Sequence, residues 1–234
     1  MIHLLLFSLW INIPSLSIAA QDMAGAWETN LPDGSKGLLI ITDDYFSISY
    51  YHLNSPGFKG TEGGKVNFSE GKLEFLWEYN TLEQKKLGQL STEDFALEND
   101  KLKILQREWK RIDDGTPGQL QGVWLITGRK QNGQMNTHTP GARKTMKILS
   151  GTRFQWIAYN SDTGEFFGTG GGTYTTKNGR YTEHILFFSR DNSRVGASLA
   201  FNYELKDDQW HHSGYSSKGD PLYEIWTRRQ KLGI

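Results

Sequence analysis

The side chains best suited to acid–base or ligand chemistry gather in the C-terminal half of the chain. His211 and His212 are adjacent, and Glu183 stands in Tyr181-Thr-Glu-His184. Neighbouring side chains on a β-strand point to opposite faces, so the two histidines cannot easily share a metal ion and one should face the interior. There an imidazole serves as a ligand contact, an acid or base, or a hydrogen-bonded structural group.

Glu183 falls on the same predicted strand face as Tyr181, Ile185 and Phe187. A buried carboxylate is costly unless it is paired, so an inward Glu183 requires a partner, whereas an outward one would be solvated. The candidate partners in the sequence are Arg153, His212 and Tyr174.

Aromatic residues alternate along two further predicted strands, with Phe154 and Trp156 on one and Phe201 and Tyr203 on the other. Alternation of this kind marks an interior face, which either packs solid or lines a ligand cavity. The candidate ligand-binding residues are therefore Trp156, Tyr174, Glu183, Phe201, Tyr203 and His212.

Composition excludes several classes of chemistry. The absence of cysteine excludes thiol catalysis, Fe–S clusters and cysteine-type zinc sites. The 26 basic residues balance the 26 acidic ones, so no net field attracts nucleic acid. No Gly-x-Ser-x-Gly, Walker-type or His-Glu-x-x-His motif is present. We expect no cofactor, no metal site and no nucleic-acid partner, and we assign no catalytic residue.

Short runs of β-forming residues alternate with turn signals throughout the second half. They predict strands near 122–130, 143–149, 152–159, 169–176, 180–189, 195–206, 209–216 and 222–229. Asn178-Gly179 between two of these runs is the strongest hairpin signal. Ser91–Leu97 is the best helix candidate and equally a loop. Eight short strands predict a closed up-and-down barrel, with an open sandwich as the alternative.

An internal repeat divides the chain. Residues 36–74 align on 144–182 without gaps, and Phe58-x-Gly-Thr-x-Gly-Gly64 matches Phe166-x-Gly-Thr-x-Gly-Gly172. We expect a first barrel at 21–112, a linker at 113–119 and a second barrel at 120–234. Phe95 and Trp109 are 14 residues apart, whereas their counterparts Phe201 and Trp226 are 25 apart, so the first unit should lack one strand or hairpin.

The first twenty residues form an apolar run that ends in small side chains, which is typical of a secretory signal peptide cleaved after Ala20. We expect a periplasmic or extracellular protein without stable membrane insertion after cleavage. Residues 21–117 carry 11 basic and 17 acidic side chains, a net charge of −6, and residues 118–234 carry 15 and 9, a net of +6. Opposite charges favour docking of the two units.

A Gly-x-Trp on the first strand of each unit, with an arginine near its end, resembles the lipocalin and calycin barrels. Phe167-Gly-Thr-Gly-Gly-Gly-Thr-Tyr174, Gln209-Trp-His-His-Ser-Gly214 and Glu224-Ile-Trp-Thr-Arg228 are similar to an uncharacterised lipocalin-like family of exported Bacteroidetes proteins. The resemblance covers nearly all of the second unit. It implies an all-β chain of two tandem lipocalin-like antiparallel up-and-down β-barrels. It also implies cation–π contacts between Trp27 and Arg111 and between Trp124 and Arg228.

Two classes of function follow. The leading hypothesis is an exported protein that binds a small apolar or amphipathic molecule in the second barrel. The alternative is an exported lyase, isomerase or hydrolase on a glycan-derived or other small substrate, with Glu183 and either His212 or Tyr174 as its acid–base pair. A haem barrel with an axial His211 or His212 is a third possibility. The sequence fixes neither the ligand nor the oligomeric state.

Overall fold

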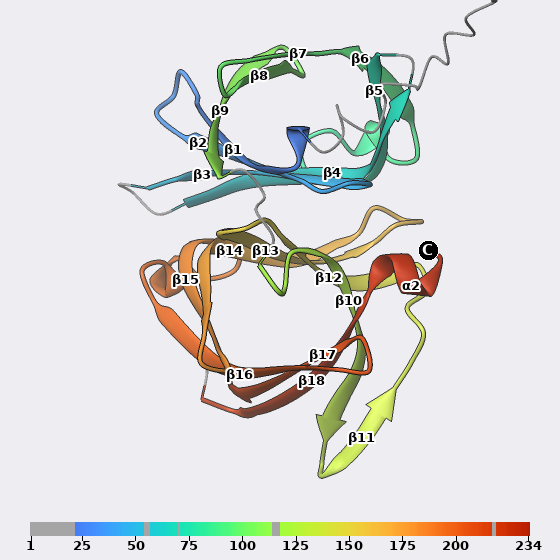
Figure 1. Ribbon diagram of the computed structural model, residues 1–234, viewed down its shortest axis with the longest axis vertical. Coiled ribbons are helices and arrows are strands. Elements are labelled where there is room, and N and C mark those ends of the chain that lie inside the picture. The colour runs from blue at the N-terminus through green and yellow to red at the C-terminus, as the bar shows by residue number, and fades with distance from the viewer. Residues whose placement is uncertain (1–21, 54–56, 70, 114–117, 217–218) are drawn as a thin grey trace, which may run out of the picture.

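The computed structural model describes residues 22–53, 57–69, 71–113, 118–216 and 219–234, which form two antiparallel β-barrels stacked on one another (Figure 1). The predicted signal peptide lies outside the described residues, as do residues 114–117 of the predicted linker. All strands pair within their own barrel. The predicted all-β class and tandem-barrel architecture are confirmed.

The first barrel is a nearly closed sheet of nine strands in the order β6-β5-β4-β3-β2-β1-β9-β8-β7. Its edge strands β6 and β7 are separated in the chain by Phe95 alone, so one bent segment carries both edges. The strands are β1 (Gly25–Asn30), β2 (Lys36–Ile41), β3 (Tyr45–His52), β4 (Gly57–Ser69), β5 (Lys72–Asn80), β6 (Leu90–Asp94), β7 (Ala96–Glu98), β8 (Lys101–Ile104) and β9 (Arg107–Asp113).

The second barrel closes fully because β10 pairs with both β12 and β18. An added strand, β11, extends β10 as a hairpin outside the ring (Figure 1). The strands are β10 (Gly122–Gln131), β11 (Gln134–Thr137), β12 (Arg143–Leu149), β13 (Arg153–Asn160), β14 (Phe166–Lys177), β15 (Arg180–Phe188), β16 (Ser198–Lys206), β17 (Gln209–Tyr215) and β18 (Pro221–Arg228).

The first barrel keeps every strand of the second barrel's ring, so the prediction of a strand or hairpin missing between Phe95 and Trp109 is wrong; the strand without a counterpart in the first barrel is β11, which lies elsewhere. Its β6 and β7 together occupy the place of β16, and β8 and β9 those of β17 and β18. The shortening comes from strand length, since β8 has 4 residues and β17 has 7. The segment Ser91–Leu97 accordingly lies in strands rather than in a helix.

The strongest hairpin predicted from the sequence, at Asn178-Gly179, is present in the structure. Asn178 and Gly179 both adopt positive φ, 51° and 71°, and join Lys177 of β14 to Arg180 of β15. This two-residue turn has the backbone twist that matches the flanking strands.

Two glycines at equivalent positions allow β-bulges. A Cβ at Gly64 would lie 1.9 Å from the Leu76 carbonyl oxygen, and a Cβ at Gly172 would lie 2.0 Å from that of His184. Both sit where the strand register shifts. The glycine-rich segments therefore serve close strand approach, as a barrel corner requires, rather than a phosphate cradle.

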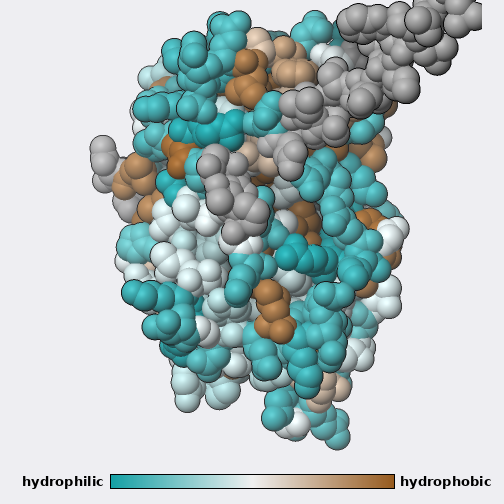
Figure 2. Space-filling model, in the orientation of Figure 1, coloured by the Kyte–Doolittle hydropathy of each residue, from teal (hydrophilic) through white to brown (hydrophobic). Residues whose placement is uncertain are grey.

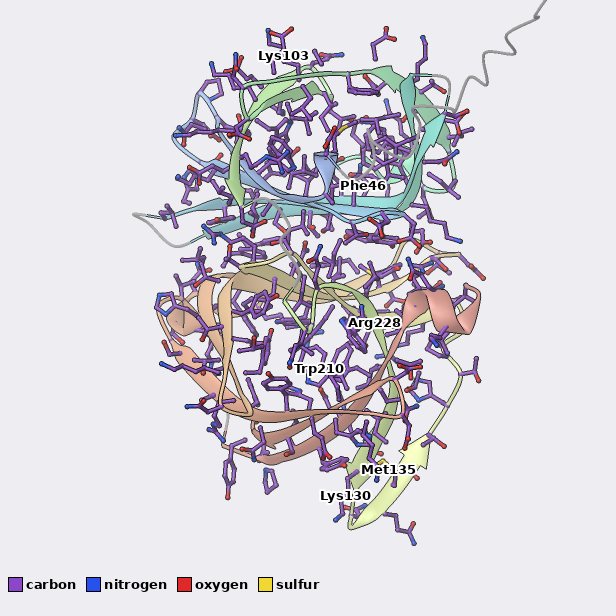
Figure 3. The ribbon with its side chains drawn as sticks, in the orientation of Figure 1. Phe46, Lys103, Lys130, Met135, Trp210 and Arg228 are labelled. Atoms are coloured by element: carbon purple, nitrogen blue, oxygen red, sulfur yellow. The ribbon has the colours of Figure 1, made fainter. Side chains whose placement is uncertain are left out.

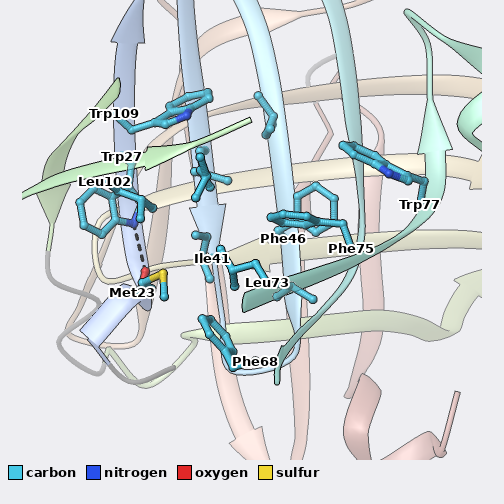
Figure 4. Packing of buried hydrophobic residues seen from close by; sticks show 14 of the residues in the cluster. Met23, Trp27, Ile41, Phe46, Phe68, Leu73, Phe75, Trp77, Leu102 and Trp109 are labelled. Carbon is cyan, nitrogen blue, oxygen red and sulfur yellow. Dashed lines mark hydrogen bonds between the residues drawn. The ribbon is translucent and has the colours of Figure 1, made fainter. Parts of the chain in front are cut away.

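Each barrel is closed at one end by its Gly-x-Trp tryptophan. The Arg111 guanidinium lies 4.0 Å from the Trp27 ring and that of Arg228 lies 4.3 Å from the Trp124 ring. Each indole Nε1 donates to a carbonyl four residues earlier, as Figure 4 shows for Trp27 and Met23. The expected cation–π contacts are confirmed at both ends.

The two barrels pack sheet against sheet through a pseudo-twofold interface. Tyr51 stacks on Phe187 with ring centroids 4.8 Å apart, and the repeat equivalents Tyr159 and Tyr79 lie at the same distance. At the centre, Gln155 donates to Thr61 and Thr169, both at 2.9 Å. Thr61 and Thr169 are themselves equivalent in the repeat, so each barrel contributes the same positions to the contact.

One charged pair crosses this interface at its edge. Arg229, the first residue of the short helix α2 (Arg229–Leu232), donates to both carboxylate oxygens of Glu78 at 2.6 and 3.0 Å. The hydroxyls of Tyr45 and Tyr159 donate to the same carboxylate at 2.9 and 2.7 Å. Although burial opposes it, hydrogen bonding to Arg229 lowers the pKa of Glu78. The acidic unit thus meets the basic unit through a specific ion pair.

Exposed apolar side chains are scattered over the surface. Figure 2 shows them on this face as small separate patches among hydrophilic residues. Among the described residues, no helix is both long and apolar enough to cross a bilayer.

We expect Trp124→Ala to lower the free energy of unfolding by about 3–5 kcal/mol, because it leaves a cavity where the indole is 1% exposed. The matched control is Tyr215→Ala, whose side chain is 67% exposed and should change stability by less than about 0.5 kcal/mol. Chemical denaturation measures both. A loss below about 1 kcal/mol for Trp124→Ala would contradict its burial.

We expect Glu78→Gln to destabilise the protein by about 3–5 kcal/mol, because the buried Arg229 guanidinium loses its counter-charge. The control is Asp208→Asn, which breaks an exposed pair with Lys231 and should leave the melting temperature unchanged. Equal melting temperatures for both variants would show that the interface does not need the ion pair.

Candidate functional site

Four of the predicted ligand-binding residues have buried side chains that belong to the interior of the second barrel. Tyr174, Glu183, Phe201 and His212 are each at most 4% exposed. Trp156 and Tyr203 are half-buried and pack against the same core cluster. Trp210, labelled in Figure 3, points into this interior beside His212, with ring centroids 5.3 Å apart. The packing of these side chains agrees with the strand alternation read from the sequence, and their role in ligand binding stays a prediction.

Glu183 finds a partner that was not among the three expected. Its Oε1 accepts a hydrogen bond from Lys147 Nζ at 2.8 Å, and both side chains are 6% exposed. Arg153, His212 and Tyr174 were the candidates, and none of them makes this contact. Lys147 lies on β12, whose alternate residues Met146 and Ile148 face the other barrel, so the lysine must point inward.

The Lys147 ammonium sits in a cage of aromatic rings. Its Nζ lies 4.8 Å from the Trp210 ring centroid, 4.9 Å from Tyr181 and 5.3 Å from Trp226. Ring faces carry partial negative charge, so the cage stabilises the ammonium in a site that water reaches poorly. Burial, with the Glu183 charge, raises the pKa of Tyr181 well above its usual value. The cation and its carboxylate together leave this layer of the interior neutral.

A second buried carboxylate, that of Glu224, lies near the Lys147–Glu183 pair. His212 Nδ1 lies 3.3 Å from Glu224 Oε2, which also accepts from Trp226 Nε1 at 3.1 Å. The half-exposed Arg129 donates to Glu224 Oε1 at 2.6 Å. Burial raises the pKa of Glu224, but the His212 hydrogen bond and the charges of Arg129 and Lys147 outweigh it and hold the pKa below its usual value.

Burial and the Lys147 charge lower the pKa of His212, so its imidazole is neutral at pH 7. An ionised Glu224 can only accept, which assigns the proton of His212 to Nδ1 and leaves Nε2 as an acceptor. Nε2 is buried and has no hydrogen-bond partner among the described residues, and neither does the buried Nε1 of Trp210. The Tyr181 hydroxyl is a third buried atom without a partner in the same cluster of rings, 5.0 Å from Trp210 and 5.8 Å from His212 between ring centroids.

His211, the neighbour of His212, lies on the opposite strand face. Its Nδ1 contacts the Tyr223 hydroxyl at 2.9 Å. The prediction that one histidine of the pair faces the interior is confirmed.

The hydroxyls of two predicted site residues, Tyr174 and Tyr203, bond to other segments of the barrel and not to its buried charged groups. The Tyr174 hydroxyl donates to the Ser150 carbonyl at 2.5 Å, and the Tyr203 hydroxyl donates to Gln119 at 2.9 Å. Both hydroxyls thus fasten segments of the barrel to each other. The acid–base pairs considered in the sequence, Glu183 with His212 or with Tyr174, are not hydrogen-bonded.

Phe187 does not share the face of Glu183. The register shift at Gly171 and Gly172 inserts Leu186 as an extra residue, so Phe187 turns outward into the interface between the barrels. Phe188 takes the inward position and packs against Trp156 at 5.6 Å. A bulge reverses the parity of every residue beyond it, which strict alternation overlooks.

Sequence reasoning missed Lys147, Glu224 and Arg129. Lys147 stands in an apolar strand and would ordinarily be expected in solvent. The available signal was the position of Lys147 between two apolar residues, Met146 and Ile148. In the structure both faces of this strand are buried, so the lysine is buried as well.

We expect stability to fall as pH drops from 7 towards 5, partly through His212. Its pKa is lowered in the folded state, so below about pH 6.5 the unfolded chain takes up a proton that the folded protein refuses. Melting temperatures of wild type and His212→Gln at both pH values measure this contribution. The variant should lose less stability than wild type. The control His211→Gln should keep the wild-type dependence, and an identical slope in all three proteins would contradict the assignment.

Comparison with known families supports the second barrel as a recognisable unit. Residues 119–232 match the model of a family described as "Domain of unknown function (DUF4488)". A search of curated proteins gives no match. The matched range spans β10 to β18 and leaves the first barrel outside it. By sequence, the second barrel is thus similar to this domain family, whose description assigns no activity.

Proposed function

We propose that the second barrel binds a small amphipathic molecule, as an exported protein of lipocalin-like form would. The observation that carries the proposal is a group of buried polar atoms without hydrogen-bond partners among the described residues of the barrel interior, His212 Nε2, Trp210 Nε1 and the Tyr181 hydroxyl. Leaving such a group unpaired costs about 1–3 kcal/mol, so a partner that supplies both bonds is favoured.

The polar atoms define one end of the ligand. The acceptor Nε2 and the donor Nε1 are complementary to a hydroxyl group, which donates and accepts at once. A net charge on that group is disfavoured, because Lys147 and Glu183 already neutralise each other and Arg129 neutralises Glu224.

The apolar side chains define the other end. Half-buried apolar residues pack against the core cluster and present part of their surface to solvent, namely Trp156, Phe188, Leu199, Tyr203 and Leu222. Burial of a hydrocarbon chain on such surface contributes about 25 cal/mol per Å². A medium-chain alcohol or another hydroxyl-bearing amphiphile combines both features.

The test is a titration of the full chain with a series of linear alcohols, followed by tryptophan fluorescence. We expect saturable quenching that strengthens with chain length. His212→Gln should weaken binding by about tenfold, because the contact between the hydroxyl and Nε2 is lost.

The matched control is His211→Gln, which changes the outward-facing neighbour and should bind like wild type. Alkanes of the same length should bind more weakly than the alcohols. Absence of saturable quenching, or equal affinity in both histidine variants, would refute the proposal.

A catalytic role is the second candidate, favoured by one observation. Glu224 holds His212 Nδ1 while Nε2 remains available, which is the arrangement of an oriented general base. Incubation of wild type with glycan fragments, followed by mass spectrometry, tests it. Product formation that His212→Gln abolishes and His211→Gln preserves would establish catalysis in place of simple binding.

A further inference from the structure

A pocket of about 370 Å³ opens at the mouth of the first barrel. Its floor consists of Tyr50, Glu62 and Trp77, which are 6%, 8% and 2% exposed. Its other charged residues are the basic Lys59, Lys86 and Arg107 and the acidic Glu83 and Glu93. Figure 4 shows Trp77 at the side of the first barrel's core, next to Phe75. The volume is within the usual range for small-molecule sites.

The floor contains a carboxylate that the chain does not neutralise. Glu62 accepts hydrogen bonds from the Tyr50 hydroxyl at 2.9 Å and from Asn80 Nδ2 at 2.7 Å, both neutral donors. No lysine or arginine of the described residues forms an ion pair with it. Burial raises the pKa of Glu62, and the charge of Lys86 opposes this only at longer range. A buried carboxylate in this position favours a cation brought by a ligand.

The second barrel shows how this fold neutralises an enclosed carboxylate. There Lys147 pairs with Glu183 at 2.8 Å among aromatic rings. The internal repeat places Leu39 where the second barrel has Lys147 and Phe75 where it has Glu183, so the first barrel lacks that internal pair. In the pocket, the Lys86 ammonium lies 5.1 Å from the Trp77 ring centroid, and it pairs with Glu83 rather than with Glu62. The rings of Tyr50 and Trp77 are nevertheless present on the pocket floor. A ligand ammonium would occupy a setting of the same chemistry.

The rim provides a site for a negatively charged group of a ligand. Lys59 is paired with Asp33, and Lys86 with Glu83 at 3.3 Å. Arg107 lies over the Tyr50 ring at 5.8 Å and forms no ion pair with a described carboxylate. Its planar guanidinium is suited to bidentate binding of a carboxylate. Tyr50 contacts Glu62 and underlies Arg107, so it stands between the two charged groups.

We propose that this pocket binds a free amino acid or a similarly small zwitterion, with its ammonium on Glu62 and its carboxylate on Arg107. The site is separate from the interior of the second barrel and does not depend on the function proposed there. The pocket lining carries charges of both signs, which favours ligands that carry both charges over simple anions or cations.

The experiment uses the full chain and the free amino acids as probes, screened at millimolar concentration by thermal shift. The best one is then titrated by calorimetry. We expect one-to-one binding. The N-acetyl derivative of that amino acid lacks the ammonium and its amide lacks the carboxylate, so each should bind about tenfold more weakly or worse.

Variants locate the site. Glu62→Gln and Arg107→Gln should each weaken binding by about tenfold or more. Arg107 is exposed, so its substitution leaves the fold intact if Glu62→Gln proves unstable. The matched controls, Glu108→Gln and Lys110→Gln on the exposed face of β9, lie outside the pocket and should bind like wild type.

Three results would overturn the proposal: no amino acid binds, the acetylated derivative binds equally well, or both pocket variants retain wild-type affinity. His212→Gln separates this site from the second barrel, because it should leave amino-acid affinity unchanged. Loss of amino-acid binding in that variant would place the zwitterion in the second barrel and contradict the assignment.

Discussion

The contact between the two barrels constrains the rest of the structure. Strands on the facing sides of both barrels are buried on two faces, one against their own interior and one against the other barrel. The contact is pseudo-symmetric, with Tyr51 on Phe187 mirrored by Tyr159 on Tyr79. The interface combines these ring contacts with the central hydrogen bond from Gln155 to Thr61, and the buried Glu78–Arg229 pair adds orientation to it.

Burial on two faces explains why charged groups lie inside the second barrel. On β12 the apolar residues Met146 and Ile148 pack in the interface between the barrels. Lys147, at the alternate position, therefore faces the interior. A lone ammonium there would be prohibitively costly, and Glu183 with the surrounding rings offsets that cost. The neighbouring Glu224 is balanced by Arg129 and holds His212 in one tautomer. The result is a polar interior in which His212 Nε2, Trp210 Nε1 and the Tyr181 hydroxyl have no hydrogen-bond partner among the described residues.

The two barrels share a fold and differ in how an enclosed carboxylate is satisfied. In the second, Lys147 of the chain neutralises Glu183. In the first, Leu39 and Phe75 replace that pair, and a different carboxylate, Glu62 on β4, lies in an open pocket and accepts hydrogen bonds from neutral donors only. Function in such repeats resides in the side chains that each copy places inside, since the shared fold specifies only where they can stand.

The sequence by itself determined the barrel class and the repeat, because two-residue alternation and turn chemistry are local properties. The Trp–Arg closures followed from the resemblance to lipocalin barrels. The structure decided that His212 rather than His211 faces inward, and that Glu183 does too. Only the tertiary structure decided which partner each charge meets. Lys147 and Glu183 are 36 residues apart, and the bulge at Gly172 turns Phe187 from the interior to the interface. Such pairings depend on register and on which face the other barrel covers. These are long-range properties that no local pattern encodes.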